Sequence, residues 1–426
     1  MIIKNFKELS KNPKKKTALQ ILEAGLESAK PQNSLKKLVY RNRIELGKTK
    51  IKLNDFANVY LVAFGKAADS MANSVDSITK IKDGIVVIPK GSNSLRLSKK
   101  YQIIKSSHPL PDKTSVRAAS TVLRFVQSKG KDDFIIFLVS GGSSALLSLP
   151  DRITLNEKIN LTRLLLKSGA NIQEINCIRK HLSQIKGGRL VENMQCSSVA
   201  LVMSDVLGDD LTSVASGMTY YDKTTFNDAL KILKKYNLQS KVSKNILKIL
   251  KLGSAGKIPE TPKSSKIKHF IIANNSTCIK EMVKKSKELR ISSKTITTLG
   301  DVRLLAKKIA RLAPKKKNSA IIFGGEPTVM VTGKGKGGRN QELVLRLLQN
   351  LQNSKQSFII ASIGTDGIDG NTKYAGAISE NLTSRANEKT SFLKTNNSSS
   401  YFQKHGGLIN TGYTGTNLND IGLILT

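Results

Sequence analysis

Short, continuous runs of hydrophobic residues recur along the chain, separated by stretches in which hydrophobic residues have helical spacing. The runs are too short for buried helices and are rich in isoleucine, valine and phenylalanine, which is typical of buried strands. They fall at 59–64, 84–88, 134–139, 199–203, 269–273, 319–323, 328–332, 358–363 and 423–425. Between them, patterns such as that of Ala18, Ile21 and Leu26 predict amphipathic helices, here over residues 17–30. Strands that alternate with helices predict an α/β fold.

A long helix with one hydrophobic face is predicted at residues 171–190. The cations Arg179, Lys180 and Lys186 flank that face. We expect the helix to pack on a sheet, and the simplest interpretation of its cations is a solvated surface.

The regular pattern loosens after Tyr220, and residues 253–265 are rich in glycine, proline and serine. Such a stretch favours a domain boundary. We therefore expect an N-terminal domain over 1–255 and a smaller C-terminal domain over 266–410. The tail, at about 411–426, is expected to pack back on the N-terminal domain.

The net charge of +39 does not by itself indicate a nucleic-acid-binding protein. Lysines are spread over almost every segment, and aromatic residues make up only 5 % of the chain, so they are not interleaved with a basic patch. We expect no nucleic-acid partner. The positive field would instead attract small anionic substrates.

No window approaches the 18 or so uninterrupted hydrophobic residues of a membrane span, and the N-terminus lacks the hydrophobic segment of a signal peptide. A cytoplasmic protein without a membrane partner is expected. Cys177, Cys196 and Cys278 are far apart and form no C-x-x-C pair, so we expect small buried residues and no disulfide or zinc site.

Residues 324–348, GGEPTVMVTGKGKGGRNQELVLRLL, join a hydrophobic run to a helix through a loop rich in glycine and lysine. Glycines let a polyanion approach the main chain, and a helix N-terminus attracts anions, so this loop is a candidate phosphate site. Gly333, Gly335 and Gly338 also match the dinucleotide pattern G-x-G-x-x-G. The acidic residue that this pattern requires about 20 positions on is missing, which argues against a dinucleotide.

Two further loops follow predicted strands, at the edge where open α/β sheets bind ligands. Lys66 follows the run at 59–64 and begins a helix, where its charge opposes the helix dipole, so we expect a function for it. The serine and glycine loop 140–144 follows the run at 134–139 and could hold a phosphate or a carboxylate. A serine hydrolase is not indicated, because none of these serines lies in G-x-S-x-G.

Three carboxylates, Asp205, Asp209 and Asp210, follow the run at 199–203. Their repulsion calls for a cation or a proton, so one interpretation is a Mg²⁺ site with a base for a substrate hydroxyl. The other is a turn in which Asp210 caps a helix. Asp366 lies in a similar loop, where the EF-hand spacing is not met.

These loops, with Lys66 and Arg339 as point charges, are the parts that phosphoryl transfer needs. The chemistry favours a kinase.

Eight motifs then carry a resemblance over nearly the whole chain. They are GKAA at 65–68, SHPLPD at 107–112, SGGSSALL at 140–147, NCIRKHLSQIKGGRL at 176–190, SDVLGDDLTSVASG at 204–217, GGEPTVMVTGKGKGGRNQE at 324–342, TDGIDG at 365–370 and TGTNLND at 414–420. In this order they resemble the ATP-dependent glycerate kinases of the MOFRL family. The resemblance implies a Rossmann-like N-terminal domain and a smaller α/β C-terminal (MOFRL) domain. In the cleft between them, Mg·ATP would phosphorylate D-glycerate to 2-phosphoglycerate.

The resemblance also implies roles for individual residues. Lys66 and Arg339 would stabilise the transferring phosphoryl group or hold the glycerate carboxylate. Asp205 and Asp209 would act as base or as ligands of Mg²⁺. The residues expected to bind substrate or nucleotide are Ser140, Gly141, Gly142, Ser143, Ser144, Arg179, Lys186, Glu326, Gly333, Gly335, Gly338, Asn340, Asp366, Asn417 and Asp420.

Two other functions stay open at this point. One is a hydroxypyruvate reductase using NAD(P)H, because some members of the family have been labelled so. The other, a nucleic-acid-binding protein, rests on charge alone. The sequence also leaves open which aspartate is the base and whether the chain forms a homodimer.

Overall fold

The computed structural model describes residues 1–92, 97–381 and 386–426, and the chain divides into two compact units. Ser34–Ile272 form one unit, called here the inserted unit. Met1–Asn33 and Ala273–Thr426 together form the other, called the terminal unit. The inserted unit thus interrupts the terminal unit in sequence.

The inserted unit contains two sheets. Its strands are β1 (Val39–Tyr40), β2 (Arg43–Leu46), β3 (Thr49–Lys52), β4 (Asn58–Phe64), β5 (Gly84–Pro89), β6 (Tyr101–Ser106), β7 (Asp133–Val139), β8 (Ser197–Met203) and β9 (Lys268–Ala273). Strands β1 to β3 form an antiparallel sheet, and the others form a sheet in the order β6-β5-β4-β7-β8-β9. The pairs from β6 to β8 are parallel, as the buried runs predict.

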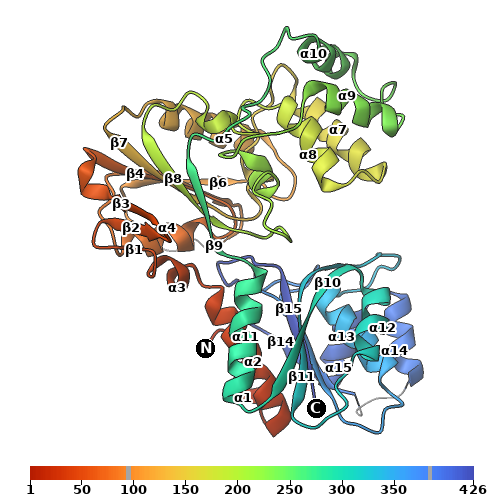
Figure 1. The fold of residues 1–426 in the computed structure, drawn as a ribbon. Coiled ribbons are helices and arrows are strands. Elements are labelled where there is room, and N and C mark those ends of the chain that lie inside the picture. The colour runs from red at the N-terminus through yellow and green to blue at the C-terminus, as the bar shows by residue number, and fades with distance from the viewer. Residues whose placement is uncertain (93–96, 382–385) are drawn as a thin grey trace. The chain divides into compact units, whose positions relative to one another are not determined.

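Helices cover this sheet and extend beyond it. They are α3 (Pro31–Leu35), which leads in, α4 (Ala68–Asp76), α5 (Lys113–Gln127), α6 (Ser143–Leu146), α7 (Leu155–Lys167), α8 (Ile172–His181), α9 (Phe226–Lys235) and α10 (Lys244–Ser254), with 3₁₀ turns at Leu53–Asp55, Arg189–Val191 and Val214–Gly217. Tyr60, Val62 and Phe64 of β4 share a core with α5. Helices α7 to α10 gather at one end of the unit around a second core that includes Phe226 and Leu233 (Figure 1).

The terminal unit is a mixed sheet between two layers of helices (Figure 1). Its strands are β10 (Ser292–Asp301), β11 (Ser319–Thr328), β12 (Ile359–Gly364), β13 (Gly376–Glu380), β14 (Leu408–Ile409) and β15 (Asp420–Leu425), and its helices are α1 (Phe6–Leu9), α2 (Pro13–Ser28), α11 (Asn275–Glu288), α12 (Val302–Arg311), α13 (Arg339–Asn350), α14 (Ala386–Lys394) and α15 (Ser398–His405). The order is β10-β11-β15-β12-β13-β14, with β15 antiparallel to both of its neighbours.

The α/β fold with a parallel sheet in one unit and a second sheet in the other confirms the predicted fold class. The predicted boundaries are wrong, however. Residues 1–33 belong to the terminal unit, because the hydrophobic face of α2 packs against α11: a Cβ on Gly25 would lie 2.9 Å from Met282 Cγ and from Ile421 Cδ1. The tail does not return to the first sheet, because β15 pairs with β11 and β12 in the second.

Residues 253–265 are not the boundary either. Ile258 and Thr261 are buried within the inserted unit, and β9, which we expected in the second α/β block, joins the first sheet. The helix predicted to reach residue 190 ends at His181, and the run at 328–332 is no separate strand, since β11 ends at Thr328. The three cysteines are free and buried, as predicted.

Candidate active site

The order of strands in the first sheet places a ligand-binding edge beside Lys66 and the loop 140–144. The chain runs outward from β4 to β6, then returns to start again with β7 on the other side of β4. Ligands of open α/β sheets bind where the order reverses in this way, at the carboxyl ends of the strands. Phe64 and Val139 end the two strands in register, so both predicted loops meet at that point.

Hydrogen bonds lock these two loops together. The amide of Lys66 donates to Gly141 O at 2.8 Å, and the amide of Ala67 donates to Ser140 Oγ at 3.0 Å. The hydroxyl of Ser143 donates to Phe64 O at 3.0 Å and to Ser140 O. Ser140 and Ser143 are therefore structural at these contacts, and they fix the position from which the Lys66 side chain extends.

Position 142 requires a glycine. Its φ of +85° lies in the left-handed region that other residues rarely adopt. A Cβ built on it would lie 3.2 Å from Lys66 Cγ and 3.3 Å from Cδ2 and Nε2 of His108. The lysine stem and the imidazole thus converge over Gly142. In the sequence, His108 stood out only as part of the motif SHPLPD at 107–112.

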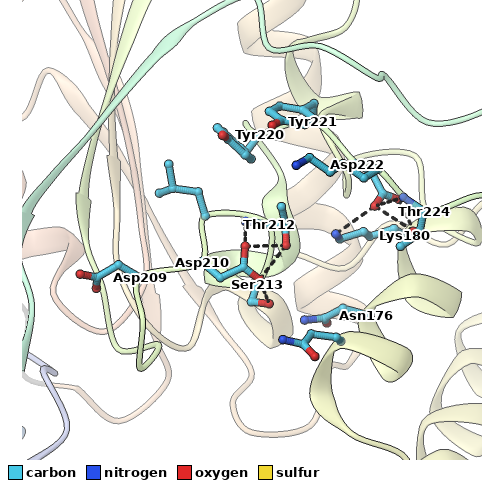
Figure 2. Close-up of a pocket in the computed structure, with 13 residues that line it drawn as sticks. Asn176, Lys180, Asp209, Asp210, Thr212, Ser213, Tyr220, Tyr221, Asp222 and Thr224 are labelled. Carbon is cyan, nitrogen blue, oxygen red and sulfur yellow. Dashed lines mark hydrogen bonds and ion pairs between the residues drawn. The ribbon is translucent and has the colours of Figure 1, made fainter.

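The Asp-rich loop after β8 lines a pocket of about 460 Å³ (Figure 2). Asp209 and Asp210 lie on its wall, with Asn176 and Lys180 of α8 and the rings of Tyr220 and Tyr221. Asp209 is in the left-handed region, at φ +56°. This strained conformation at a pocket wall is typical of functional loops.

Asp210 stabilises a turn, in line with the second of the two interpretations of the Asp-rich loop. Its carboxylate accepts from the amide of Thr212 at 3.0 Å and from the hydroxyl of Ser213 at 2.8 Å (Figure 2). Burial acts to raise the pKa of Asp210, but these hydrogen bonds hold it below its ordinary value. Asp210 thus remains ionised as a structural acceptor. Asp205 and Asp209 are left as the candidates for chemistry.

The basic residues around α8 are not a solvated surface, so that expectation is wrong. Lys180 is 3 % exposed and pairs with Asp222 at 3.2 Å (Figure 2). Lys186 is fully buried, and its ammonium donates to Ser144 O at 3.1 Å. Arg179 is half-buried, and its Nε has no hydrogen-bond partner. The helix ends at His181 and turns, which brings Lys186 under the 140–144 loop.

The hydroxyl of Ser144 connects that loop to the pocket. Its Oγ lies 2.7 Å from Ser216 Oγ, which in turn donates to Asn176 Oδ1 at 3.1 Å. Ala215 and Ser216 are both in the left-handed region, at φ +53° and +54°. Sequence reasoning missed Ser216, and only its place in the motif 204–217 could have indicated it.

In the terminal unit, Arg339 is bound by two carboxylates. Its Nε lies 2.6 Å from Asp420 Oδ2, and its Nη1 donates to Glu326 Oε1 at 3.1 Å. Burial acts to lower the pKa of Arg339, but the charges of Asp420 and Glu326 hold it above its ordinary range. The structure thus brings together three predicted site residues from α13, β11 and β15.

The glycine loop 333–338 has its amides occupied by neighbouring residues. Asn396 Oδ1 accepts from the amides of Thr332 and Gly333, both at 2.8 Å. The amides of Gly335, Lys336 and Gly337 donate to Thr395 O, Asn397 Oδ1 and Asn371 Oδ1. A Cβ on Gly333 or Gly335 would collide with residues 395–397. Close packing explains these glycines without a ligand, and their predicted role in binding phosphates finds no support in these contacts.

The N-terminus of α13 is likewise occupied, by the buried carboxylate of Asp369. It accepts from the amides of Asn340 at 3.0 Å and Gln341 at 2.9 Å. Gly338 has no room for a Cβ, which would lie 2.3 Å from this carboxyl group. Asn340 also accepts from Ser362 Oγ at 2.6 Å, so its contacts here are structural.

The two remaining predicted residues lie in loops at the sheet edge. Asp366 Oδ1 accepts from the amide of Ile368 at 3.1 Å, after β12. Asn417 is half-buried in the segment that leads into β15. Their predicted roles in binding stay predictions.

Asp205 and Asp209 suit Mg²⁺ by their chemistry, because this ion prefers oxygen ligands and often takes only one or two carboxylates beside phosphate oxygens. Across the described parts of the chain, no three His, Cys, Asp or Glu side chains gather as an all-protein metal site would require.

Comparison with known proteins covers almost the whole chain. A domain of unknown function, DUF4147, matches residues 17–251, and the MOFRL family matches residues 319–420. The D-glycerate 2-kinase of Thermotoga maritima is 38 % identical over 96 % of this chain and 98 % of its own. The chain belongs to the glycerate kinase family. The glycerate 2-kinase of Pyrococcus horikoshii, 35 % identical over 95 % and 97 % of the two chains, is a second similar member.

The solved structure of a glycerate kinase from Thermotoga maritima matches with a TM-score of 0.83 at 36 % identity, over 96 % of this chain and 98 % of that one. Membership of the glycerate kinase family confirms the resemblance carried by the eight motifs. The relatives named here are kinases by name, and nothing in these matches favours a reductase. None of the described helices has the length and hydrophobicity needed to cross a membrane.

Proposed function

We propose that this chain transfers the γ-phosphoryl group of ATP to D-glycerate, giving 2-phosphoglycerate and ADP. The observation that supports this most directly is the near-complete match to a relative named D-glycerate 2-kinase. The convergence of Lys66 and the 140–144 loop at the reversal of strand order agrees with it.

In this proposal Lys66 stabilises negative charge on the transferring phosphoryl group from its fixed position over Gly142. One of Asp205 and Asp209 accepts the proton of the glycerate hydroxyl. Mg²⁺ would be held by the other aspartate, or by both. When bound, Mg²⁺ supplies charge that offsets the phosphates. Arg339, with its charge shared between Asp420 and Glu326, would act in orienting substrate more than in neutralising phosphate.

The first test is ADP formation by the purified chain with D-glycerate, ATP and Mg²⁺, followed by phosphorus NMR of the product. We expect ADP release that depends on glycerate and a 2-phosphoglycerate signal. NADH oxidation with hydroxypyruvate is measured in parallel. NADH consumption without ADP would overturn the proposal in favour of the reductase.

Lys66→Ala tests the site. We expect kcat/KM to fall at least about 100-fold, because a positioned charge on the transition state is lost. The matched control is Lys48→Ala, an exposed lysine of the β2–β3 hairpin, which should keep wild-type activity. Near-normal turnover of Lys66→Ala, with a native unfolding curve, would remove Lys66 from the proposed site.

A cytoplasmic location, which the sequence favours, and a homodimer, which the sequence left open, complete the proposal. Light scattering coupled to size-exclusion chromatography tests the second, since a mass of 46.5 kDa would mean a monomer.

A further inference from the structure

Three cations are buried together in the inserted unit without an acid among them. They are Lys158 of α7, Arg179 of α8 and Lys186 of the turn that follows. Lys158 is 3 % exposed and Lys186 is fully buried. Burial lowers the pKa of Lys158 to about 7, with repulsion from Arg179 adding to the effect. Burial also lowers the pKa of Lys186, and the neighbouring charges act in the same direction.

The groups that contact these cations are neutral. Lys158 donates to the hydroxyl of Ser148, Lys186 donates to the carbonyl of Ser144, and Arg179 Nε is buried without a partner. Over the described ranges, the ion pairs include none to these three side chains. Lys180, which follows Arg179 in α8, differs from these three cations because it has a counterion, Asp222, at 3.2 Å.

This arrangement is costly unless an anion completes it. A buried charge without a counterion is unfavourable, which is why the pKa of both lysines is lowered, and three such groups from separate segments add their repulsion. Buried charges of this kind are retained where they act on a ligand. Arg179 is the accessible member of the cluster, because it is half-buried while the two lysines lie deeper.

The surroundings of Lys186 are polar and strained. Ser144 is half-buried at the end of the loop at the strand reversal, and its hydroxyl meets that of Ser216 at 2.7 Å. Ser216 is held in its left-handed conformation by Gly187, whose amide donates to Ser216 O at 3.2 Å. Ser216 donates its proton to Asn176 Oδ1, so Ser144 donates its own to Ser216, and the two hydroxyls form a fixed polar chain.

We propose that Lys158, Arg179 and Lys186 form an oxyanion subsite that receives a carboxylate or phosphate group of a reactant. Arg179 contacts the anion, because a guanidinium can donate two parallel hydrogen bonds to carboxylate or phosphate. The two lysines lie deeper, and a bound anion would favour their protonated form. The two anions named for the test, glycerate and phosphate, are chosen on the basis of the proposed kinase function, while the subsite itself rests on the contacts above.

Thermal unfolding of the full chain tests the subsite directly. The midpoint is measured against sodium D-glycerate and against sodium phosphate, with glycerol and with sodium chloride of equal ionic strength as controls. We expect at least one of the two anions to raise the midpoint in a saturable manner, because a ligand of the native state stabilises it. Glycerol and sodium chloride should not do so.

Two variants separate binding from folding. Arg179→Gln and Lys186→Met should each weaken the apparent affinity for that anion at least tenfold. Without anion, Lys186→Met should unfold at the wild-type midpoint or above it, because a hydrophobic side chain replaces a buried charge. The matched control is Arg163→Gln, an exposed arginine of α7, which should respond as wild type does.

The outcomes distinguish the sources of the anion. Loss of the response to D-glycerate alone assigns a carboxylate, and loss of the response to phosphate alone assigns a phosphate group. The inference is overturned if neither anion stabilises the wild type, or if both variants keep the wild-type response.

Kinetic assays on the same proteins test the subsite and the proposed kinase function independently of each other. A wild type that binds an anion through the cluster but forms no ADP with D-glycerate would refute the kinase and leave the subsite. Variants with normal KM values for glycerate and ATP and a normal anion response would refute the subsite and leave the kinase.

Discussion

Gly142 links backbone conformation to the placement of two side chains. In Gly142→Ala the methyl group would press on Lys66 and His108, at a φ that alanine adopts only with strain. We expect about 1 to 2 kcal/mol of lost stability and a drop in kcat of tenfold or more. Activity assays and urea unfolding measure the two effects.

The control is Gly169→Ala. Gly169 has a similar φ of +80°, but a Cβ there would meet no atom within 4 Å. It should show the same loss of stability with unchanged kcat. Equal kcat in the two variants would mean that the contacts at Gly142 do not matter for turnover.

His269 gives the molecule a pH-dependent stability. Burial lowers its pKa to about 4, despite hydrogen bonds to Ile267 O and Thr219 Oγ1. Above pH 6.5 neither the folded nor the unfolded state protonates it. Between pH 6.5 and 4, His269 is protonated in the unfolded state but stays neutral in the folded state. The free energy of unfolding therefore falls by up to about 3 kcal/mol as the pH is lowered through this range. Urea unfolding across this range should show the fall, and His269→Gln should reduce it. A variant that keeps the full wild-type slope would contradict the assignment.

At the scale of the element, α13 depends on a cap that lies far away in sequence. Asp369 holds the amides of Asn340 and Gln341 and is 1 % exposed. Asp369→Ala should cost about 2 to 3 kcal/mol, because two buried amides lose their acceptor. Asp301→Ala, which removes the local and more exposed cap of α12, should cost only about 1 kcal/mol. Equal losses by urea unfolding would show that burial of the cap is unimportant.

Local patterns predicted most of the elements, and long-range contacts account for what they missed. The run at 134–139 was visible because it is continuously hydrophobic, and the helix at 339–350 because its hydrophobic residues have helical spacing. Strand β10 was missed, since its sequence SSKTITTLGD is polar and it lies at a sheet edge. The capping role of Asp369 and the pairing of β15 depend on partners that no local window contains.

The same limit applies to the candidate site. Lys66 and Ser140 could be placed because each follows a strand, and the parallel sheet brings strand ends together. Lys158 could not, because nothing nearby in sequence shows that it lies beside Arg179. The phosphate-binding role of the glycine loop was predicted for a related reason. Its amides donate to Asn396 and Asn397, which lie about 60 positions further on and could not be recognised as partners from the local sequence.

At the scale of the whole molecule, each unit has its own core and should respond to its own mutations. Leu22→Ala removes a fully buried side chain from α2 of the terminal unit, and Leu233→Ala removes one from α9 of the inserted unit. Each should cost about 2 to 5 kcal/mol. Hydrogen exchange should show the loss of protection confined to the mutated unit. A Leu22→Ala effect spread over residues 34–272 would mean that the units unfold together.

The central place of β15 in the second sheet has a consequence for synthesis on the ribosome. Helix α2 is made before the inserted unit, but the strands and the helix that it packs against are made only after residues 34–272, with β15 after the others. At about 5 to 20 residues per second, the hydrophobic face of α2 stays without α11 for roughly 10 to 50 s and without β15 for roughly 20 to 80 s. The inserted unit can fold during that interval. The residues of α2 are therefore made early and reach their native contacts late, and we expect a nascent-chain chaperone to bind α2 at Leu19 and Leu22, which are buried in the folded protein.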